Sequence, residues 1–521
     1  MFYPELDKDD SLALHTDLYE INMMYTYFKK GIADRNAVFE VFYRKEPFGN
    51  GYAVYAGLEH VIDYLKNLKF KESDLQYLKE QEGYDDDFID YLRNLKLKLT
   101  IRSMREGELV FANEPILQVE GPLAQCQLVE TAILNIINFQ TLLATKAARI
   151  KLAVQDDSIM EFGSRRAQET DAAIWGTRAA YIGGFDSTSN VRAGKLFNIP
   201  ISGTHAHSLV EAFGSEYEAF KAYAETHKDC VFLVDTYDTV RSGVPNAIKV
   251  ANEMGDKINF LGVRIDSGDM AYISKQVRKE LDDAGYPNAK IFASNDLDEN
   301  TITNLKMQGA KIDVWGIGTK FITAYDQPAL GAVYKLVAME DDVHAMRDTL
   351  KISSNAIKVS TPGKKQVWRI SANTAKKNEG DWVSRYDDPR KFDALFMFHP
   401  QYTYINKVVT DYTAIPLLHD IFKEGKLVYK QPSLDEIKKF CADNLDGLWD
   451  EYKRSLNPQE YPVDLSQNLY ESKMNLIQDI RRKIRERSIG RWENYKKKLL
   501  LMNMFNLKLI LRRKSDVQSI S

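Results

Sequence analysis

Two histidines and two hydroxyl side chains follow a short apolar run near the middle of the chain. The run Ile199-Pro-Ile-Ser ends at Gly203, and Thr204, His205 and His207 come directly after it. An apolar run of strand length that ends at a glycine places the next residues at the mouth of a sheet. Neutral imidazoles at such a position act as nucleophiles, bases or metal ligands. We therefore predict an active-site loop here.

A metal centre is one alternative for the histidine pair. Metal-dependent hydrolases use His-x-His at a strand end, because alternation places both imidazoles on one side. Such a centre needs further ligands, and no histidine after His207 lies at the end of a predicted strand. The three cysteines (Cys126, Cys230 and Cys441) are far apart, so we expect free buried thiols. The sequence therefore disfavours a metal hydrolase.

Two further strand ends carry groups that suit a sugar phosphate. Arg264 offers a planar fork for a carboxylate or phosphate, and Asp266, with Ser267 beside it, can accept from sugar hydroxyls. The run Trp315-Gly-Ile-Gly318-Thr319 is a glycine-rich turn whose free amides suit a phosphate. Together these two strand ends are stronger evidence for such a ligand than either alone.

An aromatic residue beside two guanidinium groups marks another strand end. Phe162 is followed closely by Arg165 and Arg166. This combination suits a flat anionic ring. The run Val231-Phe-Leu-Val-Asp235 also ends in an acid, although a buried strand followed by a helix cap would read the same way.

The elements that must position these groups form a repeat. From about residue 157, short apolar runs end in polar or glycine residues and are followed by helical patterns. The runs lie at residues 158–166, 199–207, 231–238, 259–268, 290–296 and 313–320. The last four begin roughly 25 to 35 residues apart, which is the length of one strand–helix unit. We predict parallel strands in a β/α barrel with its site at their C-terminal ends, although a doubly wound open sheet would look similar.

The flanking regions have different patterns. We expect residues 1–125 to form an N-terminal α/β domain, completed by residues 350–430, around a barrel at 126–345. Residues 431–498 read as a helical C-terminal region, and residues 499–521 as a basic, apolar tail of unknown role. We expect the chain to end in a helix whose apolar side packs on the body or on a partner subunit; a membrane-surface helix is the alternative.

The composition describes an ordinary globular chain. Of 521 residues, 44% are hydrophobic and 28% charged, which is enough for two or three folding units. The net charge of −4 disfavours nucleic-acid binding. No signal-peptide pattern or run of ~18 apolar residues is present, so we expect a cytoplasmic protein with small-molecule partners and no membrane partner.

Taken together, the motifs resemble those of the nicotinate phosphoribosyltransferase family. The matching segments are Thr16-Asp-Leu-Tyr19, Phe39-Glu-Val-Phe-Tyr-Arg44, Glu161-Phe-Gly-Ser-Arg-Arg166, Gly203-Thr-His-Ala-His207-Ser, Val234-Asp-Thr-Tyr237, Ser242-Gly-Val-Pro-Asn246, Gly262-Val-Arg-Ile-Asp-Ser-Gly-Asp269, Gly316-Ile-Gly-Thr319 and Gly331-Ala-Val-Tyr-Lys-Leu336. The resemblance implies an irregular β/α (TIM-like) barrel of type II phosphoribosyltransferases with a second, discontinuous α/β domain, assembled as a homodimer. It also implies transfer of phosphoribosyl from 5-phosphoribosyl 1-pyrophosphate to nicotinate, coupled to ATP hydrolysis and assisted by Mg²⁺, as the first step of NAD salvage from nicotinate.

The resemblance also implies residue roles. ATP would phosphorylate His207, whereas His205 occupies a variable position without an assigned role. We add the hypothesis that Asp235 orients the His207 ring. The implied ligand contacts are Phe162 and the partner subunit's Tyr19 for the pyridine ring, Arg264 and Thr204 for nicotinate, Asp266 and Ser267 for the ribose, Gly318 and Thr319 for the 5-phosphate, and Arg165 with the partner subunit's Arg44 for pyrophosphate. The magnesium ligands are not identified.

Two other functions remain open from the sequence. Nicotinamide phosphoribosyltransferase shares the barrel and the phosphorylated histidine, and an amide-specific site would present a carboxylate to the amide, for which Asp186 is a candidate. A non-catalytic nucleotide-binding scaffold is the other possibility. The intact set of His207, Arg264, Asp266 and Thr319 argues against it.

Overall fold

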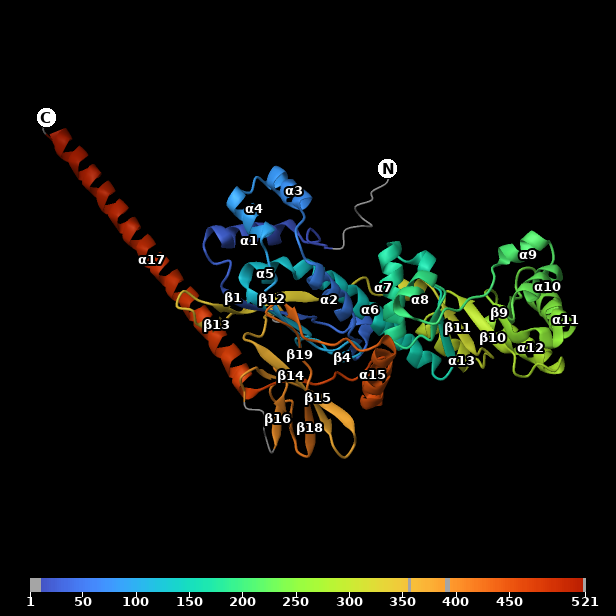
Figure 1. Ribbon diagram of the computed structural model, residues 1–521. Coiled ribbons are helices and arrows are strands. Elements are labelled where there is room, and N and C mark those ends of the chain that lie inside the picture. Colours follow the sequence, from blue (N-terminus) through green and yellow to red (C-terminus); the bar gives the residue numbers. More distant parts are fainter. Residues whose placement is uncertain (1–10, 355–357, 389–393, 519–521) are drawn as a thin grey trace.

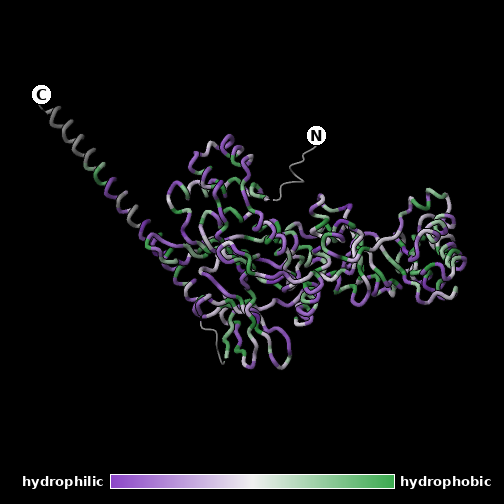
Figure 2. Tube along the Cα trace, in the orientation of Figure 1, coloured by the Kyte–Doolittle hydropathy of each residue, from purple (hydrophilic) through white to green (hydrophobic). Residues whose placement is uncertain are grey.

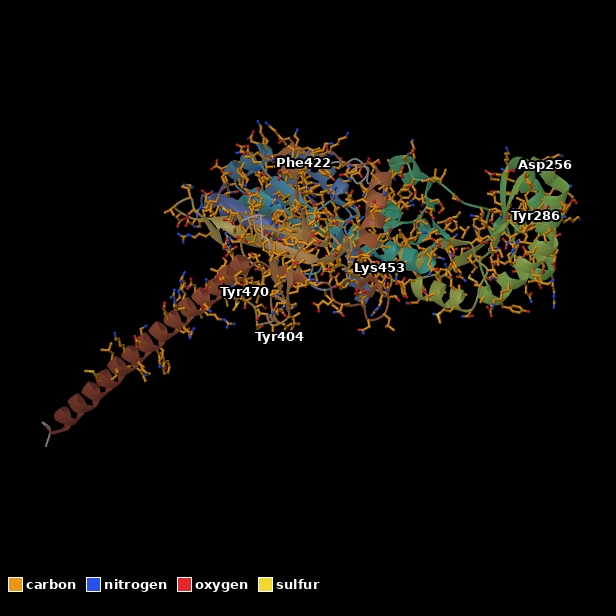
Figure 3. The ribbon with its side chains drawn as sticks, turned by 90° about the horizontal axis from the view of Figure 1, so that it is seen from below. Asp256, Tyr286, Tyr404, Phe422, Lys453 and Tyr470 are labelled. Carbon is orange, nitrogen blue, oxygen red and sulfur yellow. The ribbon has the colours of Figure 1, made fainter. Side chains whose placement is uncertain are left out.

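The computed structural model describes residues 11–354, 358–388 and 394–518 (Figure 1). The sequence-central barrel forms one end of the elongated body, and strands from both flanks form the other. The two ends meet through the long helix α6 (Glu130–Val154). In the second view, Asp256 and Tyr286 mark the barrel end and Phe422 and Tyr470 the flanking end (Figure 3).

Six parallel strands form the barrel sheet in the order β7-β6-β11-β10-β9-β8. Their bounds are β6 (Ser158–Glu161), β7 (Ser187–Thr188), β8 (Asp229–Leu233), β9 (Asn259–Ile265), β10 (Lys290–Asn295) and β11 (Val314–Ile317). Because β11 pairs back onto β6, the strands follow chain order around a ring, as in a β/α barrel. The predicted irregular barrel is therefore confirmed.

Helices connect these strands, and four of the eight begin at a residue whose side chain caps the helix. They are α7 (Glu169–Ile182), α8 (Val191–Phe197), α9 (His207–Phe213), α10 (Glu216–Thr226), α11 (Val244–Met254), α12 (Met270–Asp283), α13 (Glu299–Met307) and α14 (Thr319–Ile322). Side-chain oxygens of Asn190, Ser215, Asp269 and Asp298 accept N-cap hydrogen bonds at α8, α10, α12 and α13. At these four helices the capping hydrogen bond fixes the residue at which the helix begins.

One predicted barrel strand differs in the structure. The run at Ile199 forms only an isolated parallel bridge between Ile201 and Thr188 of β7. Pro200 has no N–H to give to a ladder, which shortens the pairing. No ladder joins Ile201 to β8 in the described chain, so the ring has a seam at this point.

The flanks share a seven-stranded sheet in the order β13-β12-β1-β5-β3-β19-β20. Its strands are β1 (Asn36–Phe42), β3 (Thr100–Ser103), β5 (Leu117–Pro122), β12 (Val333–Glu340), β13 (Met346–Asp348), β19 (His419–Lys423) and β20 (Lys426–Leu427). All the neighbouring pairs are antiparallel. β12, which the expected boundary at 345 assigns to the barrel, instead pairs with β1, because its apolar face completes the core on this sheet.

Helices from the N-terminal flank cover this sheet. They are α1 (Leu18–Lys29), α2 (Leu58–Asn67), α3 (Glu72–Glu82), α4 (Asp86–Arg93) and α5 (Leu123–Leu128), and the short strands β2 (Ala53–Val54) and β4 (Leu109–Val110) pair nearby. The stretch Leu123–Val154 is long and apolar enough to cross a membrane, but two thirds of its most apolar window are buried inside the body. It is a core helix: a Cβ on Gly183 at the end of α7 would lie 2.4 Å from the Ala147 Cβ.

A second sheet lies beside the first, in the order β18-β14-β15-β21. It contains β14 (Lys365–Ala372), β15 (Lys377–Arg385), β18 (Tyr412–Pro416) and β21 (Val463–Leu465), next to the hairpin β16 (Leu395–Phe398) and β17 (Asn406–Val409). Helices α15 (Leu434–Gly447) and α16 (Asp450–Lys453) precede β21. The C-terminal region is thus not wholly helical, because β21 adds a parallel strand to β15.

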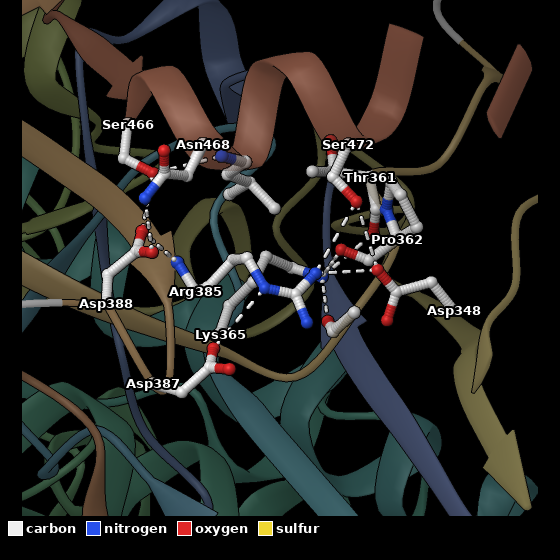
Figure 4. A network of polar contacts seen from close by, with 12 residues as sticks. Asp348, Thr361, Pro362, Lys365, Arg385, Asp387, Asp388, Ser466, Asn468 and Ser472 are labelled. Carbon is white, nitrogen blue, oxygen red and sulfur yellow. Dashed lines mark hydrogen bonds and ion pairs between the residues drawn. The ribbon is translucent and has the colours of Figure 1, made fainter. Parts of the chain in front are cut away.

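The last helix, α17 (Gln467–Gln518), is anchored at its beginning (Figure 4). Asp388 accepts from Ser466 at 2.9 Å and from Asn468 at 3.0 Å, and Asp348 accepts from Arg385 at 2.6 Å and Ser472 at 3.2 Å. Beyond these turns the helix projects from the body, first along a hydrophilic and then a more hydrophobic stretch (Figure 2). Ile484, Trp492, Tyr495 and Leu499–Met502 are exposed, so these described side chains do not make the expected contacts with the body of the single chain.

Candidate active site

Side chains from several strand ends meet at the C-terminal rim of the barrel. Asp235 follows β8, and Phe162 follows β6. Arg264 is the next-to-last residue of β9, and Asp266 comes directly after this strand. Gly318 follows β11. His207 is the first residue of α9. Parallel strands bring their C-terminal ends to one edge, which explains why residues far apart in sequence share this rim.

The His207 ring contacts three side chains on β8 and β9 ends. Its Nδ1 lies 3.1 Å from the Thr236 hydroxyl. Its Nε2 lies 3.9 Å from a carboxylate oxygen of both Asp235 and Asp266. The ring is partly open to solvent, with 38% of its side chain exposed. A γ-phosphate can therefore reach it, while the hydroxyl holds the other nitrogen.

Asp235 links the ends of β8 and β9. Its Oδ2 accepts from the Asp266 N–H at 2.9 Å and from the Ser267 hydroxyl at 2.6 Å. Its Oδ1 is buried and has no hydrogen-bond partner. Because 3.9 Å exceeds hydrogen-bond range, the side chain that bonds the His207 ring is Thr236, and Asp235 is placed beside it.

Arg264 is a half-buried cation with unused donor capacity. Its Nη1 donates to the Thr204 hydroxyl at 2.5 Å, whereas its Nε is buried without a partner. Burial lowers the pKa of the guanidinium, and nearby Arg165 lowers it further, against the opposite effect of Asp266 and Asp235. A carboxylate placed against Nε would satisfy this donor and offset the burial.

A glycine creates the place for Phe162. A Cβ on Gly316 would lie 2.7 Å from two ring carbons of Phe162, so only glycine lets the ring lie over β11. Gly318 and Thr319 follow at the start of α14. Lys320, the next residue, forms an ion pair of 2.9 Å with Asp298, so its charge is already partnered.

Glu161, the residue before Phe162, links the elements around that ring. It is fully buried and accepts hydrogen bonds from Thr177 on α7 at 3.0 Å, from Thr188 on β7 at 2.7 Å and from the Gly163 N–H. Burial raises the pKa of its carboxyl group. Its three donors tie β6, β7 and α7 together below Phe162.

Tyr19 and Arg44 lie away from this cluster in the single chain. Tyr19 is on α1, and Arg44 follows β1; both elements are in the flanking body, at the opposite end from α9 (Figure 1). Tyr19 is 46% exposed, and the buried Nε of Arg44 has no partner. The remaining ten predicted site residues lie on the barrel rim.

The structure also accounts for residues outside the predicted set. Thr236 and Ser294, which donates to Asp266, belong to the site. Thr236 lies within the matching segment Val234-Asp-Thr-Tyr237, but no role is predicted for it from the sequence. Asp186 accepts from the Ile159 N–H at 3.0 Å and pairs with Lys438 of α15 at 3.2 Å. Its carboxylate is engaged away from the rim.

Carboxylates for a cation are few. Within the described ranges, no group of three or more His, Cys, Asp or Glu side chains could by itself hold a metal ion. Magnesium usually binds through one or two carboxylates together with substrate phosphates and water. The free Oδ1 of Asp235 and the nearby carboxylate of Asp266 fit that pattern.

Family models and known proteins match the chain over most of its length. Residues 14–138, 158–365 and 364–473 match models of the nicotinate phosphoribosyltransferase N-terminal domain, family and C-terminal domain. The chain is 61% identical to a nicotinate phosphoribosyltransferase of Bacillus subtilis over 92% of this chain and 98% of that protein. It is 36% identical to one of Dictyostelium discoideum over 89% and 88%.

A solved structure agrees with this result. Human nicotinic acid phosphoribosyltransferase is 30% identical, with a TM-score of 0.79 over 88% of this chain and 99% of that chain. The matched segments contain the rim residues His207, Asp235 and Arg264. The chain belongs to the nicotinate phosphoribosyltransferase family.

Proposed function

We propose that this nicotinate phosphoribosyltransferase couples nucleotide formation to ATP through phosphorylation of His207. The overall reaction would convert nicotinate, 5-phosphoribosyl 1-pyrophosphate, ATP and water into nicotinate mononucleotide, pyrophosphate, ADP and phosphate. The observation that carries this proposal is the His207 ring, held at Nδ1 by Thr236 while Nε2 faces a partly open rim. A neutral imidazole nitrogen can attack the γ-phosphorus as ADP leaves, and water later releases phosphate from the ring.

The nucleotide would lie across the rim. Arg264 would pair with the nicotinate carboxylate through its free Nε, and Thr204, already bonded to Arg264, would contact the same ligand. Phe162 would cover one face of the pyridine ring. Gly318 and Thr319 would hold the 5-phosphate with backbone amides and a hydroxyl.

The ribose and the leaving group would lie near the two acids. Asp266 would accept from the ribose hydroxyls, with Ser267 placed beside it by its bond to Asp235. When bound, Mg²⁺ would neutralise charge on the phosphates. Arg165 would bind pyrophosphate from the same rim. Catalysis would then rest on positioning and charge neutralisation, and no strong base is needed.

A homodimer would complete each site. Tyr19 and Arg44 lie far from His207 in one chain, yet Tyr19 is exposed and Arg44 has an unused donor. Supplied by a partner subunit, Tyr19 would cover the second face of the pyridine ring and Arg44 would reach the pyrophosphate. We also expect a cytoplasmic enzyme, in keeping with three buried free cysteines.

The test follows phosphate and product together. The protein is incubated with γ-labelled ATP, phosphoribosyl pyrophosphate, Mg²⁺ and nicotinate or nicotinamide. We expect acid-labile label on the wild type and none on His207→Ala, with mononucleotide formed from nicotinate in preference to nicotinamide. Full labelling of His207→Ala would exclude this phosphate acceptor, and preference for nicotinamide would exclude the assigned substrate.

A further inference from the structure

The barrel seam lies directly under the active-site loop. β8 pairs with β9 along one edge, and along its other edge no ladder joins it to a described strand of this sheet. At this edge the Leu233 N–H donates to Nε2 of His205 at 3.2 Å. The imidazole thus takes the place that a backbone carbonyl of a neighbouring strand would fill.

The His205 ring is built into the wall of the barrel. It is 8% exposed and packs against Phe220 and Tyr223 of α10, with ring centroids 5.7 and 5.2 Å away. Because Nε2 accepts, the proton must sit on Nδ1, which faces the Ala206 carbonyl at 3.4 Å. Burial lowers the pKa of His205 to about 4, so the ring stays neutral and remains an acceptor near pH 7.

The same loop makes two contacts with ligand-binding strand ends. Thr204 is bonded to Arg264 on β9, and His207 is bonded to Thr236 after β8. His205 lies between them and points to the opposite side, into β8 and α10. Three anchors within four residues therefore fix this loop across a seam that has no ladder of its own.

We propose that His205 is a positioning residue that closes the barrel seam and thereby sets the places of Thr204 and His207. The effect of His205 on the position of His207 rests on the proposed phosphorylation of His207. Its effect on the position of Thr204 concerns nicotinate binding and does not depend on that phosphorylation. Without an acceptor at this point, the Leu233 N–H would be buried and unpaired, and the loop would lose its attachment to β8.

The experiment compares side chains that differ in where they place an acceptor. In His205→Gln the amide oxygen can reach the position of Nε2, whereas in His205→Asn it stops near Nδ1. His205→Phe keeps the ring and loses the acceptor. His227→Gln is the matched control, because the ring of His227 also stacks on Tyr223 but His227 is exposed.

Three measurements are made on the full-length protein. Hydrogen exchange of the peptide containing Leu233 reports the hydrogen bond itself. Nicotinate KM and kcat report the ligand site, and the rate of labelling from γ-labelled ATP reports His207. We expect His205→Asn and His205→Phe to lose protection at Leu233 and to raise nicotinate KM about tenfold, the size expected for one lost buried hydrogen bond. Labelling should slow to a similar extent.

The variants with an acceptor decide the outcome. His205→Gln should retain protection and lie within about twofold of wild type, and His227→Gln should be unchanged. If Leu233 keeps its protection in His205→Asn, or if His205→Gln is as impaired as His205→Asn, the proposal is wrong. If neither the wild type nor any variant is labelled, the proposed phosphorylation of His207 is wrong. The hydrogen-exchange and KM results then still decide the role of His205. An unfolded His205→Phe leaves the Gln and Asn pair to decide.

Discussion

Arg264 donates a hydrogen bond to the hydroxyl of Thr204 at 2.5 Å and thereby joins β9 to the loop that carries His207. The contact leaves the Arg264 Nε buried and unpaired. The guanidinium is thus oriented by one neighbour before any ligand arrives. The planar guanidinium of an arginine held in this way has a fixed orientation, and that orientation determines which anion can pair with it.

Replacing this fork should weaken nicotinate binding. Arg264→Lys keeps the charge but loses Nε and the bond geometry to Thr204. We expect nicotinate KM to rise by a factor that corresponds to roughly 1.5 to 3 kcal/mol. Steady-state kinetics with varied nicotinate would measure it, with Arg454→Lys on the exposed surface as control. An unaltered KM would remove Arg264 from the carboxylate site.

The Thr236 hydroxyl should matter for phosphorylation of His207. Thr236→Val keeps the shape and removes the contact at Nδ1. We expect labelling from ATP to slow by about fivefold, since one neutral hydrogen bond contributes about 1 kcal/mol. Thr226→Val, on the exposed end of α10, should label at the wild-type rate. Equal rates for both variants would show that the ring is oriented by something else.

The surface under Phe162 should tolerate no side chain. Gly316→Ala would place a Cβ 2.7 Å from the ring, so the ring must move. We expect a rise in nicotinate KM of about tenfold with little change in overall folding, because the strand around Gly316 is otherwise unaltered. Gly447→Ala, where the nearest atom lies at 3.6 Å, is the control. Wild-type kinetics for Gly316→Ala would contradict the stacking role.

Stability should fall as the solution becomes acidic, in part through His205. Its folded pKa of about 4 lies below the ordinary value of 6.5, so the unfolded chain binds the proton more readily. This contribution is complete above pH 6.5 and is lost as pH falls towards 4, with a size on the order of 3 kcal/mol. Thermal unfolding between pH 7.5 and 5 should show a smaller loss for His205→Gln than for wild type. A parallel loss in both would exclude His205 as a source.

The projecting part of α17 should be dispensable for catalysis. The family models end at residue 473, and the described side chains between Ile484 and Met504 are largely exposed. We expect a chain that ends at residue 480 to keep its kcat, its KM values and its melting temperature within about 2 °C, because the described side chains beyond that point are exposed and contribute nothing to the core. Loss of activity on truncation would instead place this helix in the working assembly.

The sequence predicts the residues of the barrel rim better than it predicts the strand pairing that positions them. The strands before Asp235, Asp266 and Gly318 are readable because parallel strands buried on both faces are nearly continuous apolar runs. β7 is only two residues long and leaves no such run. The segment at Ile199 has the apolar residues but not the pairing, since Pro200 cannot donate to a ladder.

The missed contacts depend on three-dimensional neighbours. The sequence draws attention to the acid before Thr236 rather than to Thr236 itself. The partner of Thr236, His207, is 29 residues away in the sequence. The place of β12 beside β1 could not be read from local pattern, because a strand shows its apolar face but not the sheet that receives it. The same holds for β21. This strand of three residues pairs with β15, although the sequence around it has a helical pattern.

The pairing of β3 with β19 has a consequence for synthesis on the ribosome. Arg102 of β3 donates a hydrogen bond to the carbonyl of Leu418, the residue before β19, and the two residues are 316 apart in the sequence. At roughly 5 to 20 residues per second, about 15 to 60 s pass between their translation. All the barrel strands are translated within that interval, so the barrel can form first. During this time β3 at the edge of the flanking sheet has not yet paired with β19. A chaperone that shields this edge would act on the newest chains and have no target once β19 has arrived.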